Sequence, residues 1–426
     1  MEIFLSPQNP FGAIVLAVIA SALVTLARVF RRPLIRSARR IAGNRPRLLR
    51  LLRNGADRVY PTWREGAGYT RQQYGLRWRI AEIRKLRRPP VVIAGGLYLD
   101  VHLTPVDVEN LDGSEYGNLD TVQVECGGSA LFMGRYLFER YGLRSHLFSR
   151  LGSGDPLSDT LCRLLEQESW IEGSDIAKVP GLQCGVSAHL LRRNGFHTTF
   201  THMGALGGLR WGPIAAGLKR KTRRGGVLYI SGYFRTDLCT DLIRTLQTMP
   251  PRVLVCVDHG RFRKEENPRA ASALTDAFAA GLVDLYVCTY SEITELMASA
   301  GLTVEAPGPE ETLPEETLSQ ETLPAKTLPE DILKNLRTFA EARKLPPVTI
   351  VRGGVESPHP GAYVMFEGKV EFVRADVDPQ VPYAEPGRKN AFNAALVHEL
   401  AVGRPDMDLS EAVMGATQRA VQAWLR

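Results

Sequence analysis

Short apolar runs alternate with amphipathic segments along the chain from about residue 91 onward. The apolar runs have the length that is typical of buried parallel strands, and they occupy residues 91–96, 227–231, 253–257, 282–288 and 348–351. Helical periodicity falls between them, at residues 130–141, 157–169, 237–248, 270–279, 333–343 and 391–402. Strands that alternate with helices predict an α/β fold with a parallel sheet covered on both faces.

A longer apolar run lies near the N-terminus. After a short segment of residues 1–10, residues 11–30 are apolar except for Arg28 and a few small polar side chains. About 20 such residues suffice to cross a bilayer as a helix, whereas a buried core helix is rarely apolar on every face. A cleaved signal peptide needs positive charge before the apolar run, but here Glu2 precedes it and five arginines follow between residues 31 and 40. We therefore expect one N-terminal transmembrane helix over residues 11–30.

The same charge asymmetry predicts the orientation of this helix. The positive-inside rule places Met1 outside and the main domain on the cytoplasmic or matrix side. A single-pass protein of a bacterial or mitochondrial inner membrane fits this pattern, and so does a plastid inner membrane.

Residues 31–90 form an arginine-rich juxtamembrane arm with helical patterns at residues 45–53 and 74–88. The first 90 residues hold 18 Arg and one Lys against four acidic residues, so the rest of the chain is net negative although the whole carries +7. We expect the arm to bind membrane lipids or a membrane-protein partner. An RNA-binding arm is the rival interpretation, but the adjacent apolar run makes lipid the simpler one, and no nucleic acid is expected.

Cysteine spacing bounds the metal chemistry. The six cysteines are scattered, and no two stand at Cys-x-x-Cys spacing. A zinc or iron–sulfur site is therefore poorly supported, and buried reduced thiols are expected.

An acidic, proline-punctuated repeat of ETLP and its variants occupies residues 305–331. Such low complexity predicts a solvated insertion within the domain. A partner-docking segment is the alternative, although a polar repeat lacks the apolar anchors that docking usually needs.

Seven short motifs stand in a fixed order along residues 91–426. They are Gly95-Gly96-x-x-x-Asp100, Gly127-Gly128-Ser129-Ala130, residues 152–158 (GSGDPLS), residues 199–205 (TFTHMGA), residues 258–261 (DHGR), Glu292, and residues 386–392 (PGRKNAF). Together they resemble the ribokinase/PfkB family of sugar and nucleoside kinases. The resemblance implies a ribokinase-like three-layer α/β/α domain over residues 91–426, with a small β lid built partly from residues 101–125.

The resemblance also implies roles for individual residues. Substrate binding falls to Asp100, Gly127 and Gly128; anion or nucleotide binding falls to Gly353, Gly387, Arg388 and Lys389; and metal binding falls to Glu292. An active member of the family uses ATP and Mg²⁺. Because the lid commonly dimerises in this family, a homodimer is a further expectation.

The position of the catalytic base departs from the family pattern. The family's Gly-Ala-Gly-Asp loop is Gly387-Arg388-Lys389-Asn390 here. An asparagine amide cannot accept a proton at neutral pH, and general-base help is typically worth about 10² to 10⁴ in rate. Other expected polar or turn positions are also replaced, at Phe132, Ser158, Leu206, Thr289, Val351 and Ala384. No intact catalytic residue is therefore expected.

Three hypotheses follow from these losses. The first is a catalytically inactive (pseudokinase) member that serves as a structural or accessory subunit of a membrane-associated complex. The second is an active ATP-dependent carbohydrate or nucleoside kinase with an altered base. The third is a sugar-phosphate or nucleotide sensor that uses Arg388 and Lys389 at a helix N-terminus. Three of the retained acids also have a purely structural interpretation: Asp155 as a helix N-cap, Glu292 as a first-turn helix acid, and Asp258 as the ion-pair partner of Arg261 beside a strand.

Overall fold

The computed structural model describes residues 71–106, 120–171, 175–192, 197–260, 268–302, 329–342, 345–352, 361–374, 388–403 and 408–425. The chain divides into two compact units, Met1–Tyr69 and Thr70–Arg426, and only the second is described. The predicted transmembrane helix, the arm up to residue 70, most of the 305–331 insertion, Gly353 and Gly387 lie outside the described residues. Among the described helices, none is both long and apolar enough to cross a membrane.

A nine-stranded sheet forms the centre of the second unit, in the order β13-β12-β11-β10-β9-β8-β1-β4-β5. From β11 to β5 neighbouring strands are parallel, and β12 and β13 complete one edge as antiparallel strands. The strands are β1 (Val91–Gly95), β4 (Ser145–Ser153), β5 (Ile176–Pro180), β8 (Gly226–Ser231), β9 (Val253–Asp258), β10 (Leu285–Thr289), β11 (Val348–Arg352), β12 (Gly361–Phe366) and β13 (Lys369–Arg374). The apolar runs of the sequence thus became the inner strands.

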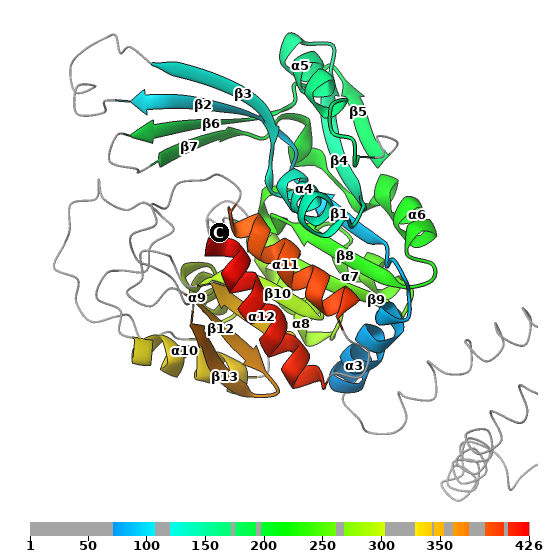
Figure 1. The fold of residues 1–426 in the computed structure, drawn as a ribbon, viewed down its shortest axis with the longest axis vertical. Coiled ribbons are helices and arrows are strands. Elements are labelled where there is room, and N and C mark those ends of the chain that lie inside the picture. Colours follow the sequence, from blue (N-terminus) through cyan, green and yellow to red (C-terminus); the bar gives the residue numbers. More distant parts are fainter. Residues whose placement is uncertain are drawn as a thin grey trace, which may run out of the picture. The chain divides into compact units, whose positions relative to one another are not determined.

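Helices cover both faces of this sheet (Figure 1). One face packs against α3 (Arg71–Arg84), α4 (Ser129–Tyr141), α11 (Arg388–Val402) and α12 (Leu409–Leu425). The other packs against α6 (Trp211–Lys221), α7 (Leu242–Gln247), α8 (Pro268–Ala279), α9 (Tyr290–Ser299) and α10 (Pro329–Glu341), while α5 (Pro156–Leu165) lies beside β4. Side chains alternate between the two cores along each strand, because β-strand side chains point to opposite faces. The predicted parallel sheet with helices on both faces is confirmed.

A second sheet of four strands, in the order β3-β2-β6-β7, stands apart from the central sheet (Figure 1). It consists of β2 (Tyr98–Val106), β3 (Thr121–Gly127), β6 (Gly185–Arg192) and β7 (His197–His202), and we call it the lid. The predicted lid segment, residues 101–125, supplies most of β2 and β3. The strands β6 and β7 were not predicted, although Val186, Ala188 and Leu190 alternate with Ser187 and His189 along β6.

Helix α3 packs on the central domain, although sequence patterns placed it in the arm before residue 91. Its Leu76, Ile80 and Ile83 recur at helical spacing and are buried in the core beneath α11. Two of its arginines bind the domain as well, since Arg79 forms an ion pair with the buried Asp284 and Arg84 Nε donates to a backbone carbonyl of α11 at 3.1 Å. The apolar stripe, rather than the arginine content, therefore determines where this segment lies.

Candidate functional site

Asp100 lies on β2 against the end of β3, where the sequence places two glycines. Its side chain is 3% exposed. A Cβ added at Gly127 would lie 1.8 Å from Asp100 Oδ2, and one added at Gly128, which has φ +102°, would lie 2.6 Å from the carbonyl oxygen of Gly96. These glycines thus make room for the carboxylate and for the tight turn into α4. The structure brings together the three residues to which the resemblance assigns substrate binding.

One face of the lid is polar across all four strands. Paired positions in the three ladders of the lid place side chains in two rows, Glu125–Asp100–Ser187–Thr201 and Gln123–His102–His189–Thr199. These residues share a face because they alternate with the apolar positions of the same strands. We call this surface the polar face of the lid.

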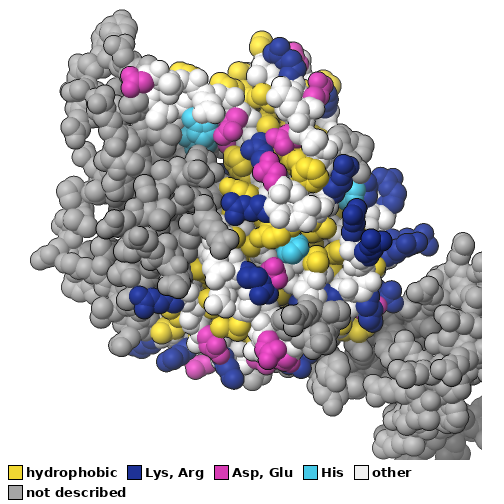
Figure 2. All heavy atoms as spheres, in the orientation of Figure 1, with side chains coloured by type: hydrophobic (Ala, Val, Ile, Leu, Met, Phe, Trp, Pro, Cys, Tyr) yellow, Lys and Arg dark blue, Asp and Glu magenta, His cyan; other side chains and the backbone are white. Residues whose placement is uncertain are grey.

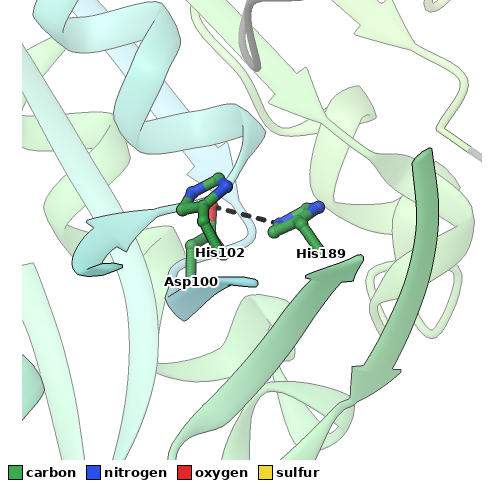
Figure 3. Close-up of side chains that lie close together, drawn as sticks. All are labelled: Asp100, His102 and His189. Atoms are coloured by element: carbon green, nitrogen blue, oxygen red, sulfur yellow. Dashed lines mark ion pairs between the residues drawn. The ribbon is translucent and has the colours of Figure 1, made fainter. Parts of the chain in front are cut away.

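Two histidines lie side by side on the polar face (Figure 3). His102 and His189 are direct neighbours in the parallel β2–β6 ladder, and their rings stack with centroids 4.8 Å apart. His102 Nε2 is 3.0 Å from Glu125 Oε1, and this hydrogen bond raises the pKa of His102 and lowers the pKa of Glu125. His189 Nδ1 is 3.1 Å from Thr199 Oγ1, and its Nε2 is 3.7 Å from Asp100 Oδ2.

Sequence reasoning missed both histidines. His102 stands two residues after Asp100 on an alternating segment, which is a signal that it shares a face with Asp100. His189 has no such signal, because its place depends on the pairing of β2 with β6.

A second polar cluster lies at the carboxyl ends of the central strands, on the side that α11 covers. Arg352 Nη2 donates to Asp258 Oδ1 at 3.2 Å, and the two residues are 5% and 2% exposed. Tyr229 and Ser231 alternate onto the same side of β8. The Tyr229 hydroxyl, the Ser231 Oγ, and Nε and Nη1 of Arg352 are buried and have no hydrogen-bond partner within the described ranges.

Glu292 lies in the first turn of α9 and forms a capping box with the N-cap residue Thr289. Its Oε2 accepts from the Thr289 backbone N–H at 2.8 Å, and the Thr289 side chain accepts from the Glu292 N–H. Burial raises the pKa of Glu292 to about 7, whereas the charges of Arg352 and Lys389 act to lower it. This is the structural role expected of a first-turn acid. The hydrogen bond from Thr289 engages one of the two carboxylate oxygens of Glu292 that metal binding would use.

Asp155 also has the structural role that the sequence offered as an alternative to ligand binding. It is the N-cap of α5, accepting from the backbone N–H groups of Leu157 and Ser158, and Pro156 follows it. Ser158, at the position of the family's turn glycine, accepts a hydrogen bond from the Cys184 N–H at 3.0 Å and so ties α5 to the start of the lid strand β6.

Asn390 lies in the first turn of α11. Its side chain is 2% exposed, and its Oδ1 has no partner within the part of the chain that the structure describes. Asn393, one turn later, is fully buried with neither amide atom paired within those ranges. Lys389 is half-buried and acts electrostatically on Glu292. The predicted anion-binding residues Gly353 and Gly387 lie outside the described residues, as does the side chain of Arg388.

This cluster fits a magnesium ion poorly. Magnesium takes oxygen ligands, including one or two carboxylates, in octahedral geometry. The carboxylates here, Asp258 and Glu292, are already opposed by the cations of Arg352 and Lys389. A further divalent cation would meet positive charge where it needs negative charge.

Comparison with known proteins gives matches among solved structures only. No protein-family model matches this sequence, and neither does any curated protein. A PfkB protein from a Polaromonas species is similar with a TM-score of 0.53 and 17% identity, over 79% of this chain and 95% of that one. Ribokinase from Cryptococcus neoformans, in complex with ADP, gives 0.55 and 14% over 79% and 94%. Phosphofructokinase-2 from Escherichia coli, in complex with substrates and products, gives 0.52 and 18% over 79% and 93%.

The architecture is therefore that of the ribokinase/PfkB carbohydrate kinases, and the resemblance seen in the sequence motifs is confirmed. The chain has a ribokinase-like fold with a large parallel sheet and a four-stranded lid. At such identities the likeness establishes the fold, and a function must be argued from the residues of the site.

Proposed function

We propose that this chain is a catalytically inactive ribokinase-like protein, anchored in a membrane and acting as an accessory subunit of a membrane-associated complex. The observation that carries the proposal is Asn390 at the start of α11, buried and unable to take a proton. An Asp at this position would supply a base, whereas the amide supplies none. The main domain then lies on the cytoplasmic or matrix side of a bacterial or mitochondrial inner membrane, as the charges around residues 11–30 predict.

The Arg352–Asp258 ion pair supports the same conclusion. Phosphoryl transfer depends on metal ions and cationic groups that contact the transferring phosphoryl group. Arg352 is instead engaged by a buried carboxylate of its own chain. Among the described residues, the charges of this cluster thus balance without a metal ion, as suits a scaffold.

The outer face of the lid supports a protein partner, either a second copy of the chain or a membrane protein. Opposite the polar face, Val124, Val101, Ala188 and Phe200 form a row across the four strands. Val122, Val124 and Phe200 are 59%, 42% and 60% exposed. Exposed apolar side chains that share one face of a sheet favour burial against a partner.

Basic side chains on the segments that precede β1 and β8 support contact with anionic lipid. Arg223 and Arg224 follow α6 and are exposed, as are Arg87 and Arg88 before β1. The two segments are adjacent, because the Val227 N–H donates to the carbonyl of Pro90 at 2.9 Å. Figure 2, in the orientation of Figure 1, shows Lys and Arg side chains gathered on the side of the molecule where α6 lies. Such residues attract anionic headgroups.

The test is a phosphotransfer assay on the full chain in detergent, with ATP, Mg²⁺ and panels of sugars and nucleosides. We expect no ADP formation above that of an Asp100→Ala control. Turnover that Asp100→Ala abolishes would overturn the proposal and establish the active-kinase alternative. Turnover gained only in Asn390→Asp would show that the rest of the site is intact and that the base alone was lost.

A sensor for a sugar phosphate or nucleotide is the second candidate function. Buried polar atoms of Arg352, Tyr229 and Asn393 that have no partner among the described residues favour it, because buried polar groups normally have partners and a ligand could supply them. A thermal-shift screen separates the two, since a ligand that binds the folded state raises the melting temperature. A shift with a phosphorylated sugar or nucleotide, lost in Arg352→Leu, would favour the sensor.

A further inference from the structure

Three metal-ligating side chains converge on the polar face of the lid (Figure 3). One ligand atom from each of Asp100, His102 and His189 can be chosen so that all lie within 4.8 Å of one another. Ligand atoms around a zinc ion are about 3.3–3.5 Å apart, as follows from bonds of about 2.0–2.1 Å in tetrahedral geometry. A bound zinc ion would therefore draw these atoms closer together than they lie in the structure. We call these three residues the histidine cluster.

Among the described residues, the hydrogen bonds around the cluster engage one nitrogen of each ring and leave the other available. His102 Nε2 is engaged by Glu125, so Nδ1 is left as its ligand atom. His189 Nδ1 is engaged by Thr199 Oγ1, so Nε2 is left. Metal-binding histidines characteristically donate their other N–H to a carboxylate, a carbonyl or water, which fixes the tautomer and the ring. Glu125 and Thr199 occupy such positions here.

The cluster also contains buried polar atoms that the described residues do not satisfy. Asp100 Oδ1 and His189 Nε2 are buried and lack a hydrogen-bond partner there, and the 3.7 Å between His189 Nε2 and Asp100 Oδ2 is too long for a hydrogen bond. Leaving such groups unpaired is costly. A cation between Asp100 and the two rings would satisfy the carboxylate oxygen and the imidazole lone pair together.

We propose that Asp100, His102 and His189 bind a divalent transition-metal ion of the zinc type. Two imidazoles and one carboxylate favour zinc and its neighbours over magnesium and calcium, which prefer all-oxygen ligands. Three protein ligands leave one tetrahedral position open. That position suits an external oxygen donor, such as a hydroxyl or carboxylate of a small molecule. Asp100 then acts as a metal ligand rather than as a direct contact to a polyol.

The experiment is zinc binding to the full chain, purified without a histidine tag and stripped of metal. Competition with a chromophoric zinc chelator measures the affinity, and Co²⁺ substitution reports the geometry through its visible absorption. We expect about one zinc per chain and the strong visible bands of a tetrahedral Co²⁺ site.

The variants separate ligands from positioning residues. His189→Gln and His102→Gln should each weaken zinc binding by more than about tenfold, and Glu125→Gln, which removes only the carboxylate partner of His102, should weaken it about 10- to 100-fold. His202→Gln is the matched control, because His202 lies on β7 of the same lid but is exposed and alternates onto the opposite face. It should bind zinc as the wild type does.

Zinc should raise the melting temperature of the wild type and of His202→Gln but not that of His189→Gln, which tests the site even if the variant is less stable. The proposal is overturned if the wild type binds no zinc at micromolar concentration, or if His189→Gln and His102→Gln bind it as tightly as the wild type. Neither outcome depends on whether the chain is a kinase, since the readout is metal binding alone.

Discussion

Arg352 Nη2 lies 3.2 Å from Asp258 Oδ1, and both side chains are almost wholly buried beneath α11. Each comes from the last residue of a central strand, β11 and β9, with β10 between them. In an open parallel sheet this edge is where ligands bind. Here an internal ion pair occupies it, and the stability of the domain should therefore depend on the pair.

Removal of the cation should be costly. In Arg352→Leu the Asp258 carboxylate stays buried without its partner, and breaking a buried pair in this way typically costs about 3–5 kcal/mol. Urea unfolding of the full chain measures the loss. The matched control is Arg244→Leu, which breaks the exposed Arg244–Asp241 pair (2.8 Å) and should cost about 1 kcal/mol or less. Equal losses in the two variants would contradict the importance of the buried pair.

Glu292 should make the domain less stable as the pH rises. Its pKa is about 7 in the folded state, chiefly because of burial, and its ordinary value is near 4.5. Between these two pH values the unfolded chain releases the proton while the folded chain keeps it, so the free energy of unfolding falls with increasing pH until the folded group also ionises. Glu292→Gln keeps a residue suited to the capping box and should remove this part of the slope.

Urea unfolding from about pH 5 to about pH 8 tests this effect in the wild type and in Glu292→Gln, with the difference between the two curves as the readout. A difference that stays constant over this range would show that Glu292 does not titrate there.

Gly127 should not tolerate even one methyl group. In Gly127→Ala the added Cβ would overlap Asp100 Oδ2, so the carboxylate must move, and forced overpacking typically costs about 1–3 kcal/mol. Gly212→Ala in α6 is the control, because a Cβ there meets nothing within 4 Å and alanine favours a helix. Thermal unfolding should show a lower midpoint for Gly127→Ala only, and zinc binding should weaken in the same variant.

The fold should require residues before the first strand. A chain that begins at residue 70 keeps Leu76, Ile80 and Ile83 of α3 in the core, whereas one that begins at residue 91 loses them, and each such side chain contributes about 1.5–3 kcal/mol by burial. Comparison of soluble yield and urea midpoint for the two truncated chains tests this. Equal stability would show that α3 is dispensable.

Much of the central domain could be predicted because its strands are buried on both faces. The runs that became β1, β8 and β9 are continuous and apolar, so each strand can be recognised from its own residues alone. The helices α6, α9 and α12 were missed; α9, for example, follows β10 directly with Thr289 as its N-cap, so no turn residues separate the two elements. The helical pattern of α3 was recognised in the sequence. Its arginines, however, led to its assignment to the juxtamembrane arm instead of the central domain.

The candidate site could be predicted only where one segment contains it. Asp100 and Gly127 come from recognisable motifs, and Asn390 was correctly placed at the start of a C-terminal helix. The structural interpretation of Asp258 paired it with Arg261, which lies outside the described residues, whereas the structure pairs Asp258 with Arg352 from two strands away. His189 reaches Asp100 in the same way, through strand pairing that no local pattern encodes.

The two-faced lid has a consequence for how this protein could change during evolution. Side chains alternate along β6, so a single inserted or deleted residue before Val186 would reverse the faces of the strand and bring side chains from the set Val186, Ala188 and Leu190 beside Asp100 and His102. The number of residues in a strand that carries such a binding surface cannot change by one without loss of the surface. Descendants that keep the histidines must also keep the length of β6, and lineages that change this length must abandon the site in one step.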